Sequence, residues 1–201
     1  MAAPFLRFVW LLVLVLVGCG GARMNDRAVY SEAARNDPRR FPYVIGVADV
    51  VRVTVWKDPS LSTDAIVRPD GTITTPLVGE VRAAGRTAAD LQKELMPRLA
   101  VYVKDAQVTV SVVEVNSYRF TVAGNVEHPG LFTSRSYLTV SEVLALAGGP
   151  TRYASTGDIV IVRTQPNGVR QRIPIDYDAI LSGHSPEQDI VILAGDAVRV
   201  P

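Results

Sequence analysis

Cys19 is the only cysteine of the 201-residue chain, and its position indicates what its thiol can do. It follows a short apolar segment, Phe8 to Val17, which a basic residue, Arg7, precedes. A basic residue, an apolar core and small residues at a cut site are typical of a secretory signal peptide. The apolar run is shorter than the roughly 20 residues that a bilayer-spanning helix needs. We therefore predict that this segment targets the chain for secretion and does not anchor it permanently.

The run Leu16-Val17-Gly18-Cys19 resembles the lipobox of bacterial lipoproteins. In that motif the cysteine thiol is acylated, and cleavage leaves the cysteine as the new amino terminus. Several acyl chains hold a protein on a membrane where one chain is marginal, because each buried CH2 contributes about 0.8 kcal/mol. Gly20 follows Cys19 in place of an aspartate, which by resemblance to enterobacterial sorting rules favours the outer membrane. We expect lipid attachment at Cys19, and the alternative is an ordinary signal peptide with an incidental cysteine.

Side chains for acid–base or metal chemistry are scarce in the rest of the chain. His128 and His184 are the only histidines and are not paired at helical spacing, so we predict no metal site and no cofactor. A glycosidase needs two carboxylates that flank a sugar. The acidic residues available for that role are Asp49, Asp70, Glu80, Asp158 and Asp176. Because turn sequences explain Asp49 and Asp70 structurally, we predict that the chain is not an enzyme and has no catalytic residue.

The charges of the chain are balanced and dispersed. It has 21 Lys and Arg against 20 Asp and Glu, and removal of residues 1–18 leaves equal numbers. A duplex-binding protein would need basic residues clustered on one face, so we predict no nucleic-acid partner. The length allows one large or two small domains, and we favour two small ones.

We divide the chain into four segments. Residues 1–18 are the predicted signal peptide, and residues 19–42 are the predicted lipidated tether, because residues 20–42 lack apolar periodicity. Residues 43–117 and 118–201 are predicted to form two α+β modules, each a small sheet with a helix.

The first module is predicted to begin near Tyr43 and to contain several short strands. Residues Val51 to Val55 alternate apolar and polar side chains, the two-residue period of a strand with one covered face. A strand from Val108 to about Val115 is predicted to close the module. Turn residues separate the strands between these two: Pro69, Asp70, Gly71, Pro76, Gly79 and Gly85.

A helix is predicted between the turns and the last strand of this module. Thr87 with Asp90 resembles a capping box that starts it. Its apolar stripe consists of Leu91, Leu95 and Leu99. Pro97 lies inside this pattern and predicts a kink or an early stop, because proline lacks a backbone donor.

The second module is predicted to contain one well-marked helix among strands. The helix follows Thr139, which Glu142 complements as a capping box, and ends at Gly148-Gly149-Pro150. The first strand, Phe120 to Ala123, precedes turns at Gly124, Pro129 and Gly130. Further strands are predicted at residues 158–163, 170–175, 190–193 and 197–200.

Two short segments of the chain have similar sequences. Gly46 to Val53 and Ala194 to Val200 both place an aspartate before a strand, Asp49 in one and Asp196 in the other. The match is too short to prove duplication. We interpret it as a shared turn-into-strand device, in which the acid accepts local backbone hydrogen bonds.

Runs in both modules resemble the outer-membrane polysaccharide export lipoproteins in identity and spacing. In the first module these runs resemble the family's polysaccharide export domain: Tyr43-Val44-Ile45-Gly46, Asp49, Val55-Trp56, Pro59, Leu61-Ser62, Pro69-Asp70-Gly71, Pro76-Leu77-Val78-Gly79 and Gly85-Arg86-Thr87. In the second they resemble its soluble-ligand-binding β-grasp module: Val122-Ala123-Gly124-Asn125-Val126, Pro129-Gly130, Thr139 to Glu142, Ala147-Gly148-Gly149 and Ala194-Gly195-Asp196. Ala48 stands where a glycine commonly precedes the aspartate and Ala106 where a proline is common, so we expect both turns to be built differently here.

The resemblance implies a location, an assembly and partners. It implies an outer-membrane lipoprotein that faces the periplasm and forms a homo-oligomeric ring in the conduit for capsular or extracellular polysaccharide. An inner-membrane polysaccharide copolymerase is implied as a partner. Family members that cross the outer membrane do so with a carboxy-terminal helix, and the sequence ends at Pro201 without one. We therefore expect the polymer to cross through a separate β-barrel porin.

Four residues are candidates for contact with the polymer. Trp56, like Tyr118, offers an aromatic face that could stack on a sugar ring, although we favour a core or subunit contact for it. Arg163, Arg170 and Arg172 form a basic group across a predicted hairpin and could line a conduit for an acidic polymer. A solvated strand face explains these arginines equally well.

Two other classes of function remain as alternatives. A structural ring subunit of a protein secretion channel would share the lipid anchor, but its gene deletion would stop protein secretion and spare the surface polysaccharide. A periplasmic sugar-processing enzyme would release reducing ends from the polymer.

Overall fold

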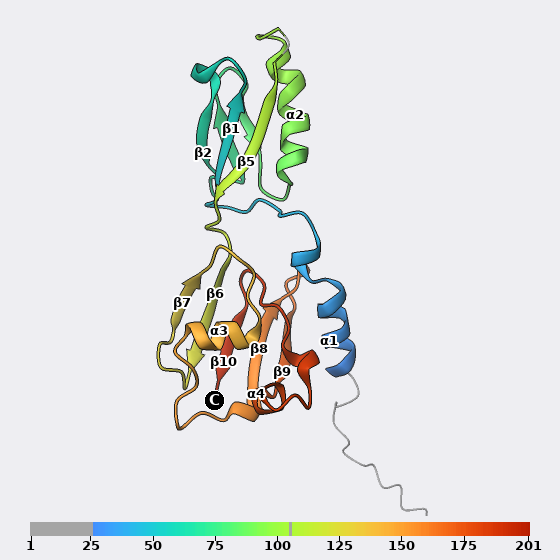
Figure 1. Ribbon diagram of the computed structural model, residues 1–201, viewed down its shortest axis with the longest axis vertical. Coiled ribbons are helices and arrows are strands. Elements are labelled where there is room, and N and C mark those ends of the chain that lie inside the picture. The colour runs from blue at the N-terminus through green and yellow to red at the C-terminus, as the bar shows by residue number, and fades with distance from the viewer. Residues whose placement is uncertain (1–25, 105) are drawn as a thin grey trace, which may run out of the picture.

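The computed structural model describes residues 26–104 and 106–201. The predicted signal peptide, the predicted lipid attachment at Cys19 and the first residues of the predicted tether lie outside this part. The described chain forms two modules along the long axis of the molecule, each with its own sheet and its own hydrophobic core (Figure 1). The predicted α+β fold class is therefore confirmed.

The first module is built on a three-stranded antiparallel sheet in the order β2-β1-β5. Its elements in chain order are β1 (Val50–Val55), the 3-10 helix η2 (Pro59–Leu61), β2 (Thr63–Ile66), β3 (Thr72–Thr75), β4 (Gly79–Arg82), α2 (Ala88–Ala100) and β5 (Val108–Glu114). Strands β3 and β4 form a separate hairpin. The inward valines of β1 and the leucine stripe of α2 belong to one buried cluster. The apolar face of the strand and the apolar face of the helix therefore pack into one core.

The turn at Pro69, Asp70 and Gly71 has the geometry that its sequence predicts. The amide of Gly71 donates to the Arg68 carbonyl at 2.8 Å, and Gly71 has a φ of 83°. That backbone conformation suits glycine because it has no Cβ. The turn leads from β2 into β3, but β3 pairs with β4 and β2 pairs with β1.

Helix α2 continues through Pro97 and ends at Ala100, so the predicted early stop is wrong. The Thr87 side chain accepts from the Asp90 amide at its start, at 3.2 Å. Leu99 lies beyond the proline and is 1% exposed. Burial of a leucine contributes about 1.5–3 kcal/mol, which is comparable to the roughly 3 kcal/mol that an interior proline costs.

Ala48 keeps the backbone conformation that glycine favours. Its φ is 75°, and its amide donates to the Val67 carbonyl at 2.8 Å. Ala48 therefore adopts a conformation that residues with a Cβ rarely adopt. An L-residue in this region costs roughly 1–2 kcal/mol.

We expect Ala48→Gly to raise the free energy of unfolding by up to about 1 kcal/mol, since glycine removes the strain but adds chain entropy to the unfolded state. Urea denaturation measures the change. Ala123→Gly is the matched control, because Ala123 lies in a strand without a positive φ and should lose stability instead. A loss of stability in both variants would contradict the strain at Ala48.

The second module is a five-stranded sheet in the order β7-β6-β10-β8-β9. Its strands are β6 (Arg119–Gly124), β7 (Gly130–Thr133), β8 (Ile159–Thr164), β9 (Arg170–Ile175) and β10 (Ala197–Val200). Only the β6–β10 pair is parallel. Helix α3 (Val140–Leu146) crosses one face of the sheet (Figure 1), and the predicted capping box of Thr139 and Glu142 is present at its start.

The segment 190–193 is not a strand, contrary to the sequence prediction. It makes a single bridge, between Val191 and Thr139. Its backbone groups bond partly to side chains, because the carbonyls of Val191 and Ile192 accept hydrogen bonds from Arg163 and Tyr118. Others bond to backbone groups outside any strand, as the Ile192 amide does to the Leu138 carbonyl. Three short helices of this module were not predicted: η3 (Thr156–Asp158), α4 (Tyr177–Leu181) and η4 (Pro186–Gln188).

Within the predicted tether, the structure has a helix that packs on the second module. Helix α1 (Asp26–Arg35) lies beside β9, and the chain then passes through the 3-10 helix η1 (Pro38–Arg40) to the first module (Figure 1). Tyr30 is 6% exposed, and its hydroxyl donates to the carbonyl of Pro174 in β9. Val29 and Ala33 pack against the same core. Only these three of the described residues of α1 contact the core, and three apolar residues are too few to give the segment a sustained helical periodicity.

Among residues 26–104 and 106–201, no helix combines the length and the apolar character that a membrane crossing requires.

Candidate functional site

The two modules are joined at a buried carboxylate, Asp49, which is fully inaccessible. Its Oδ1 accepts from the amides of Asn116 and Ser117, each at 2.8 Å. Its Oδ2 accepts from the Gly46 amide at 2.8 Å and from the Tyr43 hydroxyl at 2.6 Å. Asn116 and Ser117 form the connection between β5 and β6. Asp49 therefore fixes the link between the modules to the loop that enters the first module.

Tyr43 extends this joint toward the second module. Burial, and secondly the hydrogen bond to Asp49, raise the pKa of the Tyr43 hydroxyl well above its usual range, so it remains a donor. The ring centroid of Tyr43 lies 6.5 Å from that of Tyr137, which in turn lies 5.1 Å from that of Tyr118. Tyr118 belongs to the core of the second module. An aromatic contact path therefore runs from the joint into that core.

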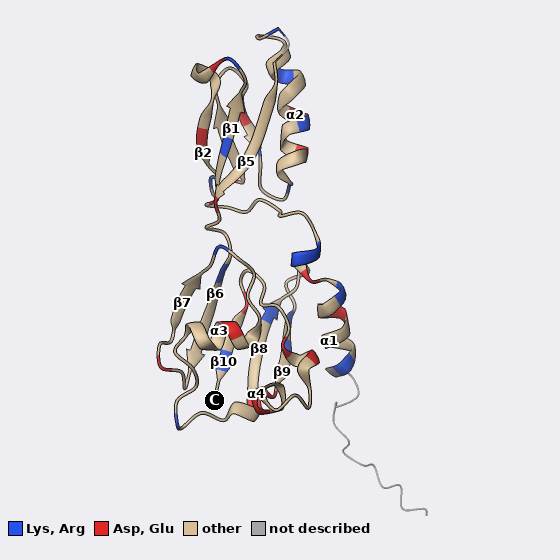
Figure 2. Cartoon of the chain, viewed as in Figure 1, with Lys and Arg blue, Asp and Glu red and all other residues tan. Residues whose placement is uncertain are grey.

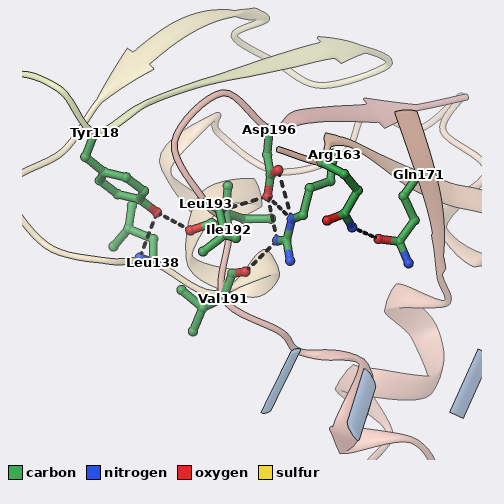
Figure 3. A network of polar contacts seen from close by, with 9 residues as sticks. Tyr118, Leu138, Arg163, Gln171, Val191, Ile192, Leu193 and Asp196 are labelled. Carbon is green, nitrogen blue, oxygen red and sulfur yellow. Dashed lines mark hydrogen bonds and ion pairs between the residues drawn. The ribbon is translucent and has the colours of Figure 1, made fainter. Parts of the chain in front are cut away.

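The second module has a related network around Asp196, which is 2% exposed (Figure 3). Its Oδ2 accepts from the Leu193 amide at 2.7 Å, as Asp49 accepts from Gly46, three residues before it. The guanidinium of Arg163 pairs with the same carboxylate at 2.6 Å and donates to the Val191 carbonyl at 3.0 Å. The likeness between the two sequence segments thus corresponds to one device, a buried aspartate that closes a turn before a strand.

The four candidate polymer-contact residues lie in different environments. Trp56 is 67% exposed at the end of β1, so it is not a core residue of the described chain. Arg163 is held by Asp196, with a side chain that is 12% exposed, and is not available to a polymer. Arg170 and Arg172 are exposed on β9. Tyr118 is buried, and its hydroxyl donates to the Ile192 carbonyl at 2.9 Å, so its ring cannot stack on a sugar.

Two family models match the chain, one in each module. Residues 37–113 match the family described as polysaccharide biosynthesis/export protein, and residues 119–174 match the SLBB domain. The chain belongs to the polysaccharide export protein family. The first match contains Asp49 and the hairpin β3–β4, and the second contains β6, α3 and β8.

Curated relatives agree with the family. The EPS I polysaccharide export outer membrane protein EpsA of Ralstonia solanacearum is 28% identical over 183 residues, which cover 79% of this chain and 48% of the relative. The capsule polysaccharide export protein BexD of Haemophilus influenzae is 25% identical over 175 residues, covering 78% and 43%. The polysialic acid transport protein KpsD of Escherichia coli is 30% identical over 144 residues, covering 70% and 25%. The chain thus spans about half the length of these relatives or less.

Four of the five acidic residues considered for catalysis have structural partners, Asp49 among them. Asp70 and Glu80 are brought together by Arg68, at 3.4 Å and 2.6 Å. The hydrogen bond from the Thr72 hydroxyl holds the pKa of Asp70 below its usual value, whereas a general acid needs a raised pKa. Asp176 caps α4 through the Ala179 amide at 2.9 Å. No group of three or more potential metal ligands gathers among the residues that the structure describes.

Sequence reasoning missed the partners of the buried aspartates. Asn116 and Ser117 act through backbone amides, which any residue type supplies, so their identity carries no signal. Arg163 was assigned to a basic surface, although its alternation with Ile159 and Ile161 along β8 places it on the core side. That alternation was the signal that could have identified it as an internal partner.

Proposed function

We propose that this chain is a periplasm-facing outer-membrane lipoprotein that forms a ring-shaped part of the conduit for capsular or extracellular polysaccharide. The observation that carries the proposal is the tandem of a polysaccharide export match and an SLBB match, in that order and in separate modules. The export names of the relatives support the same role. An inner-membrane polysaccharide copolymerase belongs to the proposal as a partner.

The position of α1 supports a defined orientation. The helix begins seven residues after Cys19, and seven residues span at most roughly 25 Å when fully extended. Since α1 packs on β9, an acylated Cys19 would keep the second module next to the membrane. The first module would then point into the periplasm, toward a partner in the inner membrane.

The sheet edges support assembly into a ring. β9 is one edge strand of the five-stranded sheet, and its Pro174 carbonyl already accepts a hydrogen bond from Tyr30 of α1. β7, at the other end of that sheet, and β2, in the first module, are also edge strands. Exposed edges can continue pairing with a neighbouring chain, and a head-to-tail contact closes into a ring when its rotation divides the circle.

Cys19→Ser tests the lipoprotein part of the proposal. In cells fed radiolabelled palmitate, we expect the wild-type chain to carry label and the variant to carry none. The variant should also leave the membrane fraction, because it carries no acyl chains and its apolar segment is too short to span the bilayer. Surface polysaccharide should fall with it. A variant that stays in the outer membrane and supports normal surface polysaccharide would contradict acyl anchoring.

A further inference from the structure

One face of the five-stranded sheet carries four exposed arginines. Along each strand, buried residues alternate with residues on the side opposite to the core. Val122, Val198 and Ile173 point into the core. Their neighbours point the other way, and the cationic ones among them are Arg119 on β6, Arg199 on β10, and Arg170 and Arg172 on β9. We call these four residues the arginine face.

The arginine face has no acidic partner. None of its four guanidiniums forms an ion pair with any carboxylate of residues 26–104 and 106–201. Arg119 donates only to a backbone carbonyl, that of Asn116, at 3.0 Å. Other exposed arginines of the chain do find partners, as Arg52 does with Asp64 at 2.6 Å. The positive charge of this face is therefore uncompensated.

The residues between the arginines are small or compact. The ladder register places Thr121, Ala197, Val162 and Arg172 side by side across four strands. Ala123, Arg199 and Val160 lie side by side in the next row. Neighbouring strands lie about 4.8 Å apart, and two residues cover about 7 Å along a strand. Arg172 and Arg199 are two strands and one row apart, so their backbones lie roughly 12 Å apart. The guanidiniums are thus spaced around a smooth centre of smaller side chains.

The helices on the opposite side of the module carry charges of both signs. Glu142 on α3, Asp178 on α4 and Glu187 on η4 are acidic, whereas α1 and η1 carry arginines, among them Arg35, Arg39 and Arg40 (Figure 2). The module as a whole is not basic, so the arginines do not reflect its composition. What distinguishes the arginine face is that its four guanidiniums form no ion pair with the described residues, which favours a partner with negative charge.

We propose that the arginine face binds the anionic groups of an acidic polysaccharide, which makes the exported polymer a polyanion. This inference rests on the proposed function. Guanidinium groups bind carboxylate and phosphate groups through two parallel hydrogen bonds, and the smooth centre lets the apolar sides of sugar rings lie flat. Contacts made singly by exposed arginines are weak and are screened by salt. A long polymer can therefore slide across the face without stalling.

The test uses the full-length chain purified in detergent, with polygalacturonate as the acidic probe and dextran as the neutral one. We expect the wild type to bind polygalacturonate at low salt, to lose it as salt is raised, and to ignore dextran. The triple variant R170Q/R172Q/R199Q should bind polygalacturonate at least about tenfold more weakly. The matched control R35Q/R40Q/R82Q removes the same charge from exposed arginines elsewhere and should bind like the wild type.

Several outcomes would overturn the proposal. Equal losses in both triple variants would show that net charge alone attracts the polymer. Equal binding of dextran and polygalacturonate would remove the acidic preference but leave polysaccharide export intact. Dissociation of an oligomer in R170Q/R172Q/R199Q, measured by mass photometry with unchanged binding per subunit, would show that the face joins subunits. The proposed function fails on separate grounds, if the gene is not needed for surface polysaccharide.

Discussion

Asp49→Ala is expected to lower the free energy of unfolding by about 3 kcal/mol or more and to loosen the two modules from one another. The substitution leaves the amides of Gly46, Asn116 and Ser117 without their acceptor. A buried donor without a partner costs about 1–3 kcal/mol, and water entering the small cavity recovers only part of this for three donors. The effect is large because one carboxylate serves both the entry loop and the link between modules.

Urea denaturation and hydrogen exchange of the Asn116 and Ser117 amides measure this effect. Tyr43→Phe is the matched control, since it removes only one of the four hydrogen bonds to Asp49, together with the contact to the Ser117 hydroxyl, and should cost about 1–2 kcal/mol. Asn116 and Ser117 should exchange much faster in Asp49→Ala than in Tyr43→Phe. Unchanged stability and protection in Asp49→Ala would show that Asp49 does not hold the joint.

Asp196→Ala is the second change with a large expected effect, a loss of about 3–5 kcal/mol in the stability of the second module. It leaves Arg163 charged and nearly buried, with the Val191 carbonyl as its remaining acceptor. It also removes the acceptor of the Leu193 amide. Thermal unfolding followed by circular dichroism measures the loss. Asp64→Ala is the matched control, because its pair with Arg52 is exposed at both ends and its loss should change stability far less.

A double variant separates the cost of the unpaired Arg163 charge from the other causes of lost stability in Asp196→Ala. Arg163→Met combined with Asp196→Ala removes both charges and keeps much of the side-chain volume, so it should recover part of the stability lost in Asp196→Ala. If the double variant were less stable than Asp196→Ala alone, the cost would not come from the unpaired guanidinium.

Capping residues and short hydrophobic patterns in the sequence predict most of the helices and strands. Thr139 and Glu142 mark the start of α3, and the valines of β1 mark the buried face of the first sheet, because caps and alternation act over a few residues. Pro97 misled the prediction because the tertiary burial of Leu99 offsets a local penalty. The segment 190–193 has the alternation of a strand, yet its backbone groups bond to side chains and to the segment around Leu138 and not along a neighbouring strand.

The candidate site was less predictable than the fold. Asp49 and Asp196 stand out in the sequence as turn residues, but their long-range partners follow only from the packing. Helix α1 was missed because its contact face is short and its partner, β9, lies far along the chain. The sequence alone indicated two members of the arginine face, Arg170 and Arg172. Arg119 and Arg199 join it only because β6 and β10 pair in parallel in the middle of the sheet.

Deletion of the gene, with surface and intracellular polysaccharide measured in the same cells, tests the central claim most directly. The account predicts that polymer disappears from the surface and accumulates inside, that secreted proteins are unchanged, and that the wild-type gene restores export. Normal surface polysaccharide in the deletion strain, or a block in protein secretion instead, would contradict it.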